Sequence, residues 1–422
     1  MPLSSTAVPR QLSTWRDRRV VAVALVALAS GYGQFGAVAA LGDVAKVFGH
    51  VAHGATVADQ AGLSGSSLGI GLAVIRLASL GALPLTSLAD RFGRRTSLLT
   101  TTAVGLGLTA LAATSPSYWV FVIVFSLGRP LLSTTNALSQ VTVAEQTGSA
   151  NRSKAVALAT AGYGVGAGLT AVIHGLWVHG EGFRWLFASS VLPLVLLVPL
   201  ASSVRETDRY RIASSAGYEM PVLGVVGSAL RSRLAVVLGV AFFVAVISGP
   251  ATSFVFLYAQ DVVRQPGYVT SLMVVAAGAA GLVGLLVGRY LADRLGRRPT
   301  IAIAIVGLAC FSTLAYSGAR AALVVGYILG VGAGSVLAPA IGSLTNELFP
   351  TSVRASAAGW VVAAAVLGAV VGLVVFGELV DVGNSFAFAA LVTFLPVVVT
   401  GALSFAVPET KGKEPEELGS AG

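Results

Sequence analysis

Short polar breaks divide the sequence into apolar runs of about 20 residues, and this pattern constrains the fold more than any other feature. A run of that length crosses the ~30 Å hydrocarbon core of a bilayer as an α-helix. Backbone N–H and C=O groups find no water in that layer, so each run is expected to be helical, and the runs lack the period-two alternation of barrel strands. The expected transmembrane helices, twelve in all, are residues 20–41, 65–88, 96–114, 118–142, 155–178, 184–203, 234–258, 269–291, 299–317, 321–344, 355–377 and 386–406.

The scarcity of charge supports an all-α integral membrane protein. Only 11% of the 422 residues are charged, whereas a soluble protein has about 25%. This excludes a soluble enzyme and a nucleic-acid-binding protein, and we expect neither enzymatic activity nor nucleic-acid binding. The single cysteine, Cys310, excludes a disulfide framework. We see no motif for a metal or a cofactor and expect none to be bound.

The basic residues predict the orientation in the membrane. If the N-terminus is inside, 21 of the 27 lysines and arginines fall in inner segments and 4 in outer ones. Such an excess is typical of cytoplasmic loops. We therefore predict cytoplasmic termini and a multi-pass protein of the plasma membrane. The remaining two residues, Arg76 and Arg129, lie within predicted helices.

The longest polar loop divides the chain into two halves of six predicted helices around a central cavity. It runs over residues 204–233 and contains five arginines. The predicted organisation is a cytoplasmic tail at 1–19, an N-terminal half at 20–203, a linker at 204–233, a C-terminal half at 234–406 and a cytoplasmic tail at 407–422.

Three motifs recur in the two halves at nearly the same offset. The sequence D-R-F-G-R-R at 90–95 reappears as D-R-L-G-R-R at 293–298, which is 203 residues later. The pair Glu145 and Arg152 reappears 202 residues later as Glu347 and Arg354. Glu206 reappears 203 residues later as Glu409, each within an E-T sequence. The chain is therefore predicted to be a duplicated six-helix unit, as in secondary transporters.

These motifs resemble those of the major facilitator superfamily. The D-R-x-G-R-R loops are similar to the loop signature of that superfamily, while E-L-F-P-T-S-V-R at 347–354 and P-E-T-K-G at 408–412 are similar to elements of its sugar-porter branch. The resemblance implies an alternating-access transporter of a small solute. It also implies a cytoplasmic gate made of contacts between the halves. The expected gating residues are Asp90, Arg91, Arg94, Arg95, Glu145, Arg152, Asp293, Arg294, Arg297, Arg298, Glu347 and Arg354.

Arg129 is the strongest candidate for substrate binding. An arginine at the centre of a membrane helix costs about 2.5–3.5 kcal/mol on insertion scales, which favours a function. Arg129 belongs to a stripe on one helix face, formed by Ser126, Arg129, Ser133, Asn136 and Gln140. Arg76 is an alternative candidate, or a structural residue, because Ala73, Leu80 and Leu83 surround it.

In the superfamily, the first, fourth, seventh and tenth helices line the central cavity. The resemblance therefore places Gln34, Arg129, Asn136, Thr252 and Ser335 there. Ser133 joins them through the stripe, and Gly249-Pro250 beside Thr252 predicts a helix break.

All 18 acidic residues lie in loops or near helix ends. The two buried arginines therefore lack a fixed counter-ion at mid-membrane, which favours an anionic substrate such as a carboxylate. If transport is proton-coupled, the candidate residues near the outer ends are Asp43, His174, Glu378 and Asp381.

Other functions remain open from the sequence alone. A sugar or polyol substrate is favoured by the tail motif and opposed by the lack of paired glutamines in 234–258. Efflux of amphipathic drugs fits the aromatic and glycine-rich helices. A non-transporting membrane sensor would need a larger soluble domain. The expected partners are the lipid bilayer, a small-molecule substrate and, in a coupled transporter, a proton.

Overall fold

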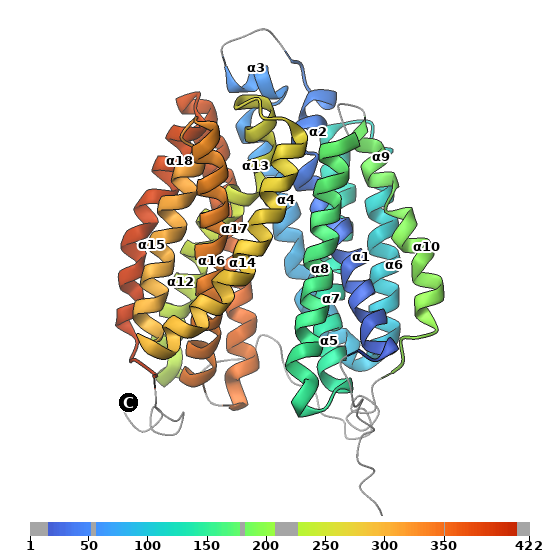
Figure 1. The fold of residues 1–422 in the computed structure, drawn as a ribbon, viewed down its shortest axis with the longest axis vertical. Helices are drawn as coiled ribbons and strands as arrows, with labels where there is room; N and C mark the ends of the chain where they lie inside the picture. The colour runs from blue at the N-terminus through green and yellow to red at the C-terminus, as the bar shows by residue number, and fades with distance from the viewer. Residues whose placement is uncertain (1–15, 52–55, 178–181, 207–226, 350, 412–422) are drawn as a thin grey trace, which may run out of the picture.

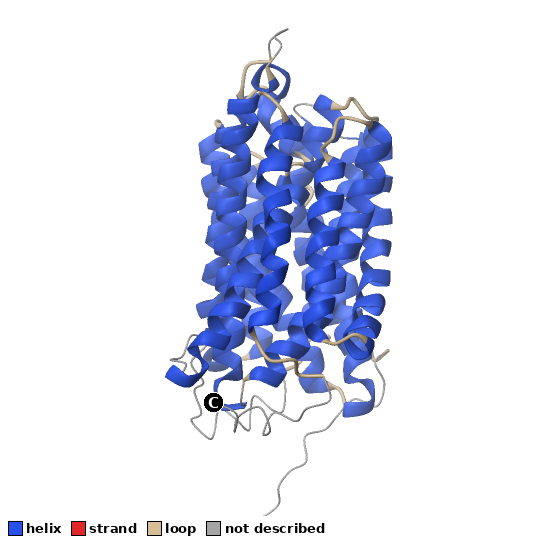
Figure 2. Ribbon diagram, turned by 90° about the vertical axis from the view of Figure 1, so that its left-hand side faces the viewer, coloured by secondary structure: helices blue, strands red, loops and turns tan. Residues whose placement is uncertain are grey.

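The computed structural model describes residues 16–51, 56–177, 182–206, 227–349 and 351–411, with several side chains inside helices excepted. The predicted linker 204–233 and the two predicted tails lie largely outside these ranges. The described chain is almost entirely helical, with long helices running in a common direction (Figure 2).

The N-terminal half contains the helices that follow the first six predicted runs. They are α1 (Arg18–Ala39), α2 (Leu41–Phe48), α3 (Val57–Ala61), α4 (Gly65–Ala78), η1 (Ser79–Gly81), α5 (Ala82–Phe92), α6 (Arg94–Ala112), α7 (Tyr118–Gln146), α8 (Ser149–Trp177), α9 (Phe183–Ala188) and α10 (Val191–Ala201).

The C-terminal half repeats this arrangement. Its helices are α12 (Ser228–Ser253), α13 (Val255–Leu257), the π-helical turn η3 (Tyr258–Val262), α14 (Gly267–Arg294), α15 (Arg297–Ala315), α16 (Arg320–Leu348), α17 (Thr351–Gly383), α18 (Phe386–Phe394) and the 3₁₀-helical η4 (Leu395–Ala406). Figure 1 shows the two halves side by side.

Eleven helical stretches of the described chain are long and apolar enough to cross a membrane. The remaining predicted run, 96–114, forms α6, which is 19 residues long but rich in threonine. Thr101 and Thr102 donate to the carbonyls of Ser97 and Leu98 at 2.7 and 2.6 Å, so the helix itself satisfies these hydroxyls.

Several predicted boundaries differ from those in the structure. The first run ends at Ala39, where the separate helix α2 begins after one residue. The break predicted at Gly249-Pro250 falls four residues later, because α12 continues to Ser253. Proline lacks its own N–H, but the Pro250 carbonyl still accepts from the N–H of Phe254 at 3.1 Å, which closes the last turn.

The halves meet at the end of the molecule that carries α2 and α3, here called the α2 end (Figure 1). Helix α4 packs against α17 and α8 packs against α14, so each contact joins one half to the other. Gly65 and Gly377 allow the backbones of α4 and α17 to approach closely: a Cβ added to Gly377 would lie 2.3 Å from the Gly65 carbonyl oxygen. Small residues at such crossings are typical of packed membrane helices.

The opposite end carries the two D-R-x-G-R-R loops and is here called the motif end. Each loop turns at a glycine with positive φ, Gly93 at 94° and Gly296 at 108°, before α6 and α15 begin. Residues with a Cβ rarely adopt this conformation, which explains the glycine in both copies of the motif.

The contact at Gly377 provides the first test. We expect Gly377→Ala to lower the melting temperature of the purified protein and to weaken the contact between the halves, because the new Cβ has no space. Gly107→Ala is the matched control: its Cβ meets nothing within 4 Å, and alanine favours a helix over glycine by about 1 kcal/mol. Equal melting temperatures for the two variants would contradict the close contact described between α4 and α17.

Candidate functional site

Polar side chains from α1 and α7 form a hydrogen-bonded cluster in the N-terminal half. Arg129 donates from Nη1 to the carbonyl oxygen of Gln34 at 3.1 Å, and Ser133 donates to Gln34 Oε1 at 3.3 Å. Gln34 Nε2 donates in turn to Ser30 Oγ at 2.9 Å, and Ser30 donates to the Leu132 carbonyl at 2.7 Å. The structure thus brings three of the predicted binding residues, Gln34, Arg129 and Ser133, into one cluster.

Arg76 of α4 lies near this cluster. It repels Arg129 electrostatically, and Tyr163 of α8 interacts electrostatically with both arginines. The helix ends two residues after Arg76, and the following turn packs against α7: a Cβ added to Gly81 would lie 3.1 Å from Pro130 Cβ. This contact holds the turn that follows Arg76 beside Pro130, the residue next to Arg129.

The two arginines retain unused hydrogen-bonding capacity. Both side chains are half-buried, and neither is paired with a carboxylate among the residues that the structure describes. Arg129 Nε is buried and has no hydrogen-bond partner in the described chain. A buried guanidinium without a counter-ion is costly and favours binding of an anion.

Asn136 lies further along the same face of α7. Its Oδ1 accepts a weak hydrogen bond from Gln140 Nε2 at 3.5 Å, within one helix. Asn136 is half-buried and shares the face with Arg129 and Ser133.

The predicted residues of the C-terminal half lie in a separate place. Thr252 and Ser335 line a cavity of about 250 Å³ between α12, α15 and α16. The Thr252 hydroxyl donates to the Ser248 carbonyl of its own helix at 2.7 Å. Tyr316, which also lines the cavity, donates to the Ala251 carbonyl at 2.9 Å. The walls are otherwise mainly apolar, so this cavity suits an uncharged group.

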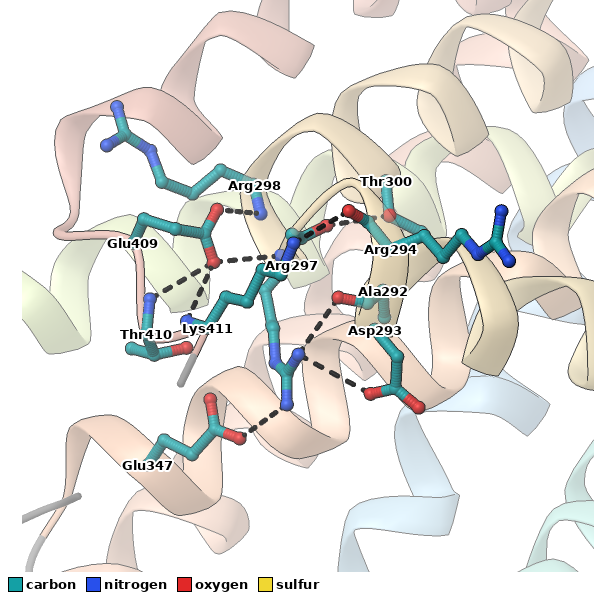
Figure 3. A network of polar contacts seen from close by, with 11 residues as sticks. Ala292, Asp293, Arg294, Arg297, Arg298, Thr300, Glu347, Glu409, Thr410 and Lys411 are labelled. Atoms are coloured by element: carbon teal, nitrogen blue, oxygen red, sulfur yellow. Dashed lines mark hydrogen bonds and ion pairs between the residues drawn. The ribbon is translucent and has the colours of Figure 1, made fainter. Parts of the chain in front are cut away.

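At the motif end, the C-terminal half holds its loop through a network centred on Arg297 (Figure 3). Arg297 donates to Glu347 Oε1 at 3.0 Å and to Asp293 Oδ1 at 3.5 Å. Glu409 accepts from the backbone N–H groups of Arg297 and Arg298 at 2.9 and 3.1 Å, so it caps the start of α15. Burial raises the pKa of Glu409, but backbone N–H donors lower it more, and the pKa lies below its usual value.

Lys411 and Arg298 complete this network. Lys411 Nζ donates to the carbonyl of Arg294 at 2.7 Å, and Arg298 Nη2 donates to the carbonyl of Phe405 at 2.5 Å. The tail after η4 is thereby attached to the D-R-L-G-R-R loop (Figure 3).

The N-terminal half repeats the network with equivalent residues. Arg94 pairs with Glu145 at 3.3 Å, and Glu206 accepts from the N–H groups of Arg94 and Arg95 at 2.9 and 3.2 Å. Arg152 donates from Nε to the Ala144 carbonyl at 3.1 Å. These contacts lie within one half, as do those of Arg297. The side chains of Asp90, Arg91 and Arg354 lie outside the described part of the structure.

The four candidates for proton coupling all lie toward the α2 end. His174 Nε2 lies 2.6 Å from Asp43 Oδ2. Asp381 of α17 accepts from the N–H groups of Gly65 and Ser66 at 2.6 and 2.8 Å, capping α4 of the other half. Glu378 is exposed.

Tyr163, Lys46 and Asp261 are not among the site residues predicted from the sequence. Lys46 of α2 forms an ion pair with Asp261 of η3 and so joins the two halves. Glu206 and Glu409 were recognised as repeated residues, but their capping role depends on the approach of chain segments more than 100 residues apart. In the sequence, only the equal offset of the motifs indicated that these segments lie close together.

The family model of the Major Facilitator Superfamily matches residues 23–313 and 265–421 of the chain. Among curated relatives, a probable 4-methylmuconolactone transporter of Cupriavidus pinatubonensis is 25% identical over 379 residues, covering 85% of this chain and 86% of the relative. A gentisate transporter of Corynebacterium glutamicum is 26% identical over 335 residues, covering 75% and 73%.

Solved structures share the fold. A D-xylose–proton symporter superimposes with a TM-score of 0.72 at 22% identity, covering 95% of this chain and 100% of the symporter chain. The nucleoside transporter NupG gives a TM-score of 0.73 at 14% identity, covering 92% and 98%.

The family match spans nearly the whole chain, and the helices, the repeated networks and the structural neighbours agree with it. The chain belongs to the Major Facilitator Superfamily and is a multi-pass transporter of the plasma membrane.

Proposed function

We propose that this transporter carries a small organic anion across the membrane by alternating access, and that Arg129 and Arg76 bind the carboxylate. The supporting observation is the pair of interacting arginines, which have no carboxylate partner among the described residues. An entering carboxylate would supply the missing negative charge and accept charge-assisted hydrogen bonds from the guanidinium groups. Tyr163 interacts electrostatically with both arginines.

The names of two relatives support this substrate class. Gentisate and 4-methylmuconolactone, the compounds in those names, are carboxylate-bearing metabolites. Gln34 and Ser133, already oriented by hydrogen bonds, could contact polar substituents of such a molecule. Asn136, Thr252 and Ser335 complete the proposed binding residues, with the cavity of the C-terminal half next to an uncharged part of the substrate.

We further propose that the chain crosses the membrane twelve times, with α6 as the least apolar crossing and both termini in the cytoplasm. This orientation makes the motif end cytoplasmic, in agreement with its many arginines, and the α2 end external. The contacts of α4 with α17 and of α8 with α14 then close the outer face in this conformation.

The two loop networks are the proposed cytoplasmic gate. In the present conformation Arg94 and Arg297 pair with Glu145 and Glu347 of their own halves. In the alternative conformation the loops would contact the opposite half. The side chains of these pairs are only 13–22% exposed, so breaking a pair without replacing it would be costly. An exchange of partners would therefore keep the free energies of the two conformations similar.

The binding proposal is tested by thermal-shift measurements on the purified protein in detergent, with gentisate, phosphate, xylose and a cationic drug as ligands. A ligand at 100 times its dissociation constant adds about 2.7 kcal/mol of apparent stability. We expect gentisate to stabilise wild type, and Arg129→Ala to weaken its binding about 10- to 100-fold, because a charge-assisted hydrogen bond contributes about 1.5–3 kcal/mol. Arg76→Gln should weaken binding less.

Arg184→Gln is the matched control for these variants. It also removes an arginine, but one that donates to the carbonyls of Ala113 and Ser115 at the α2 end. We expect it to lower basal stability and to leave the gentisate shift intact. Stabilisation of wild type and Arg129→Ala to the same extent by xylose or by the drug, without a response to gentisate, would replace the anion proposal with sugar transport or drug efflux.

The gate proposal predicts that substitutions in the loops change the rate of transport but not the affinity for the substrate. Asp90→Asn and its repeat equivalent Asp293→Asn should slow uptake into proteoliposomes while leaving the dissociation constant unchanged, because the loops lie far from the arginine cluster along the helices. Unchanged uptake in both variants would remove these loops from the mechanism.

A further inference from the structure

Four titratable side chains meet at the α2 end, on three different elements. Asp43 and Lys46 extend from α2, His174 from α8, and Asp261 from η3. His174 is 1% exposed and lies 2.6 Å from Asp43, which is 8% exposed. Lys46 is paired with Asp261, and Asp261 interacts electrostatically with both Asp43 and His174. We call these four residues the outer cluster.

The outer cluster lies in the contact between the two halves. Asp261 belongs to the C-terminal half and the other three residues to the N-terminal half. His174 lies between two points where α8 contacts α14: Ser271 donates to the Ala171 carbonyl at 2.7 Å, and a Cβ on Gly175 would meet the Gly267 carbonyl at 2.7 Å.

The ring of His174 also packs against the C-terminal half. It lies edge-on to Phe256 of α13, with 5.7 Å between the ring centroids. Separation of the halves at this end would therefore remove His174 from its packed surroundings and expose the outer cluster to water.

Three charged groups on the neighbouring elements have partners outside the outer cluster. Arg184 of α9 stacks on Phe48 of α2 and donates to the carbonyls of Ala113 and Ser115. Asp59 of α3, which packs against η3, accepts from Thr56. Arg320 of α16 donates to the Arg264 carbonyl at 3.1 Å in the loop after η3.

The outer cluster is one proton short of neutrality when His174 is neutral. Asp43 and Asp261 contribute two negative charges and Lys46 one positive charge. In the neutral histidine, Nε2–H donates to Asp43 and Nδ1 keeps its lone pair. His174 Nδ1 is buried and has no hydrogen-bond partner in the described chain, so it is a position where a proton can bind. Burial raises the pKa of Asp261, Lys46 opposes this, and the neighbouring Asp43 adds a smaller increase.

We propose that the outer cluster is a proton-binding site, loaded at His174 from the outside, and that its protonation favours closure of the α2 end. The proton passes from external water to Nδ1, and the imidazolium remains hydrogen-bonded to Asp43. Closing the halves over a neutral cluster avoids the cost of burying a net negative charge. Because the bound proton favours the closed outer face, a rise in pH, which removes that proton, favours the open outer face. This inference rests on the proposed alternating access and orientation, but not on the identity of the substrate.

The other two coupling candidates do not share these properties. Asp381 accepts two backbone N–H bonds and one from Ser66 Oγ, so it caps the start of α4. It thereby links α17 to α4 across the two halves. Glu378 is exposed.

The test measures the distance between the halves by double electron–electron resonance, without any substrate. Cys310 is first replaced by Ala, and spin labels are placed at Trp185→Cys of α9 and Val382→Cys of α17, whose native side chains are 79% and 78% exposed. The labelled protein is measured in nanodiscs at pH 5 and pH 8, which brackets the ordinary titration of histidine. We expect the open population to rise at least about fivefold at pH 8, the lower range of typical coupling.

Two variants should fix the equilibrium in opposite directions. His174→Gln can still donate to Asp43 but cannot take up a proton, so it should show the open population of wild type at pH 8 even at pH 5. Asp43→Asn makes the cluster neutral without a proton and should show the closed population of pH 5 even at pH 8. Size-exclusion profiles check the folding of both.

An unchanged distance distribution in wild type between pH 5 and pH 8 would overturn the proposal. Retention of the full pH-dependent shift by either folded variant would also overturn it. Because no ligand is present, neither result depends on whether the substrate is an organic anion. Gentisate binding measured separately on the same wild-type protein therefore distinguishes failure of this inference from failure of the proposed substrate class.

Discussion

The main physical constraint on this structure is the presence of charged side chains inside a membrane-spanning bundle. The protein keeps its acidic residues near helix ends, yet Arg76 and Arg129 lie within the spanning helices and interact with each other. Without a counter-ion such an arrangement costs free energy, and Gln34 offsets only part of that cost by accepting one hydrogen bond from Arg129. The proposed anionic substrate supplies the missing charge. Binding of the substrate would then remove this free-energy cost.

The polar contacts at the two ends of the molecule differ in whether they repeat in both halves. At the motif end the contacts repeat, with Glu206 and Glu409 capping α6 and α15 in the same way. At the α2 end they do not repeat: Lys46 pairs with Asp261 and Asp381 caps α4 across the halves. The network that holds each loop is present in both halves, whereas the contacts that join the halves at the α2 end have no repeat among the described residues.

Much of the fold could be predicted from the sequence, because bilayer thickness and backbone hydrogen bonding leave few alternatives to a helix. The family resemblance rested on residues such as Asp293 and Arg297, which are recognisable without coordinates, and the family match confirms it. Helix ends were less predictable. Pro250 was expected to break its helix, but the carbonyl of Pro250 still accepts from Phe254, and the break follows at that residue.

The candidate site was only partly predictable, for a physical reason. Periodicity showed that Arg129 and Ser133 share a helix face, but periodicity cannot tell which other helix that face meets. Tyr163 and the turn after Arg76 come close to Arg129 only through the packing of α4, α7 and α8. Thr252 and Ser335 were expected to line one central cavity with Arg129, and in the structure they line a cavity of the C-terminal half.

The most direct test of the central claim is a cryo-electron microscopy structure of the protein with gentisate bound. The account predicts that the carboxylate lies within hydrogen-bonding distance of the Arg129 guanidinium, with Arg76 as its second positive neighbour. A carboxylate bound elsewhere, with Arg129 still bonded only to the Gln34 carbonyl, would show that the two arginines hold the bundle together and do not bind the substrate.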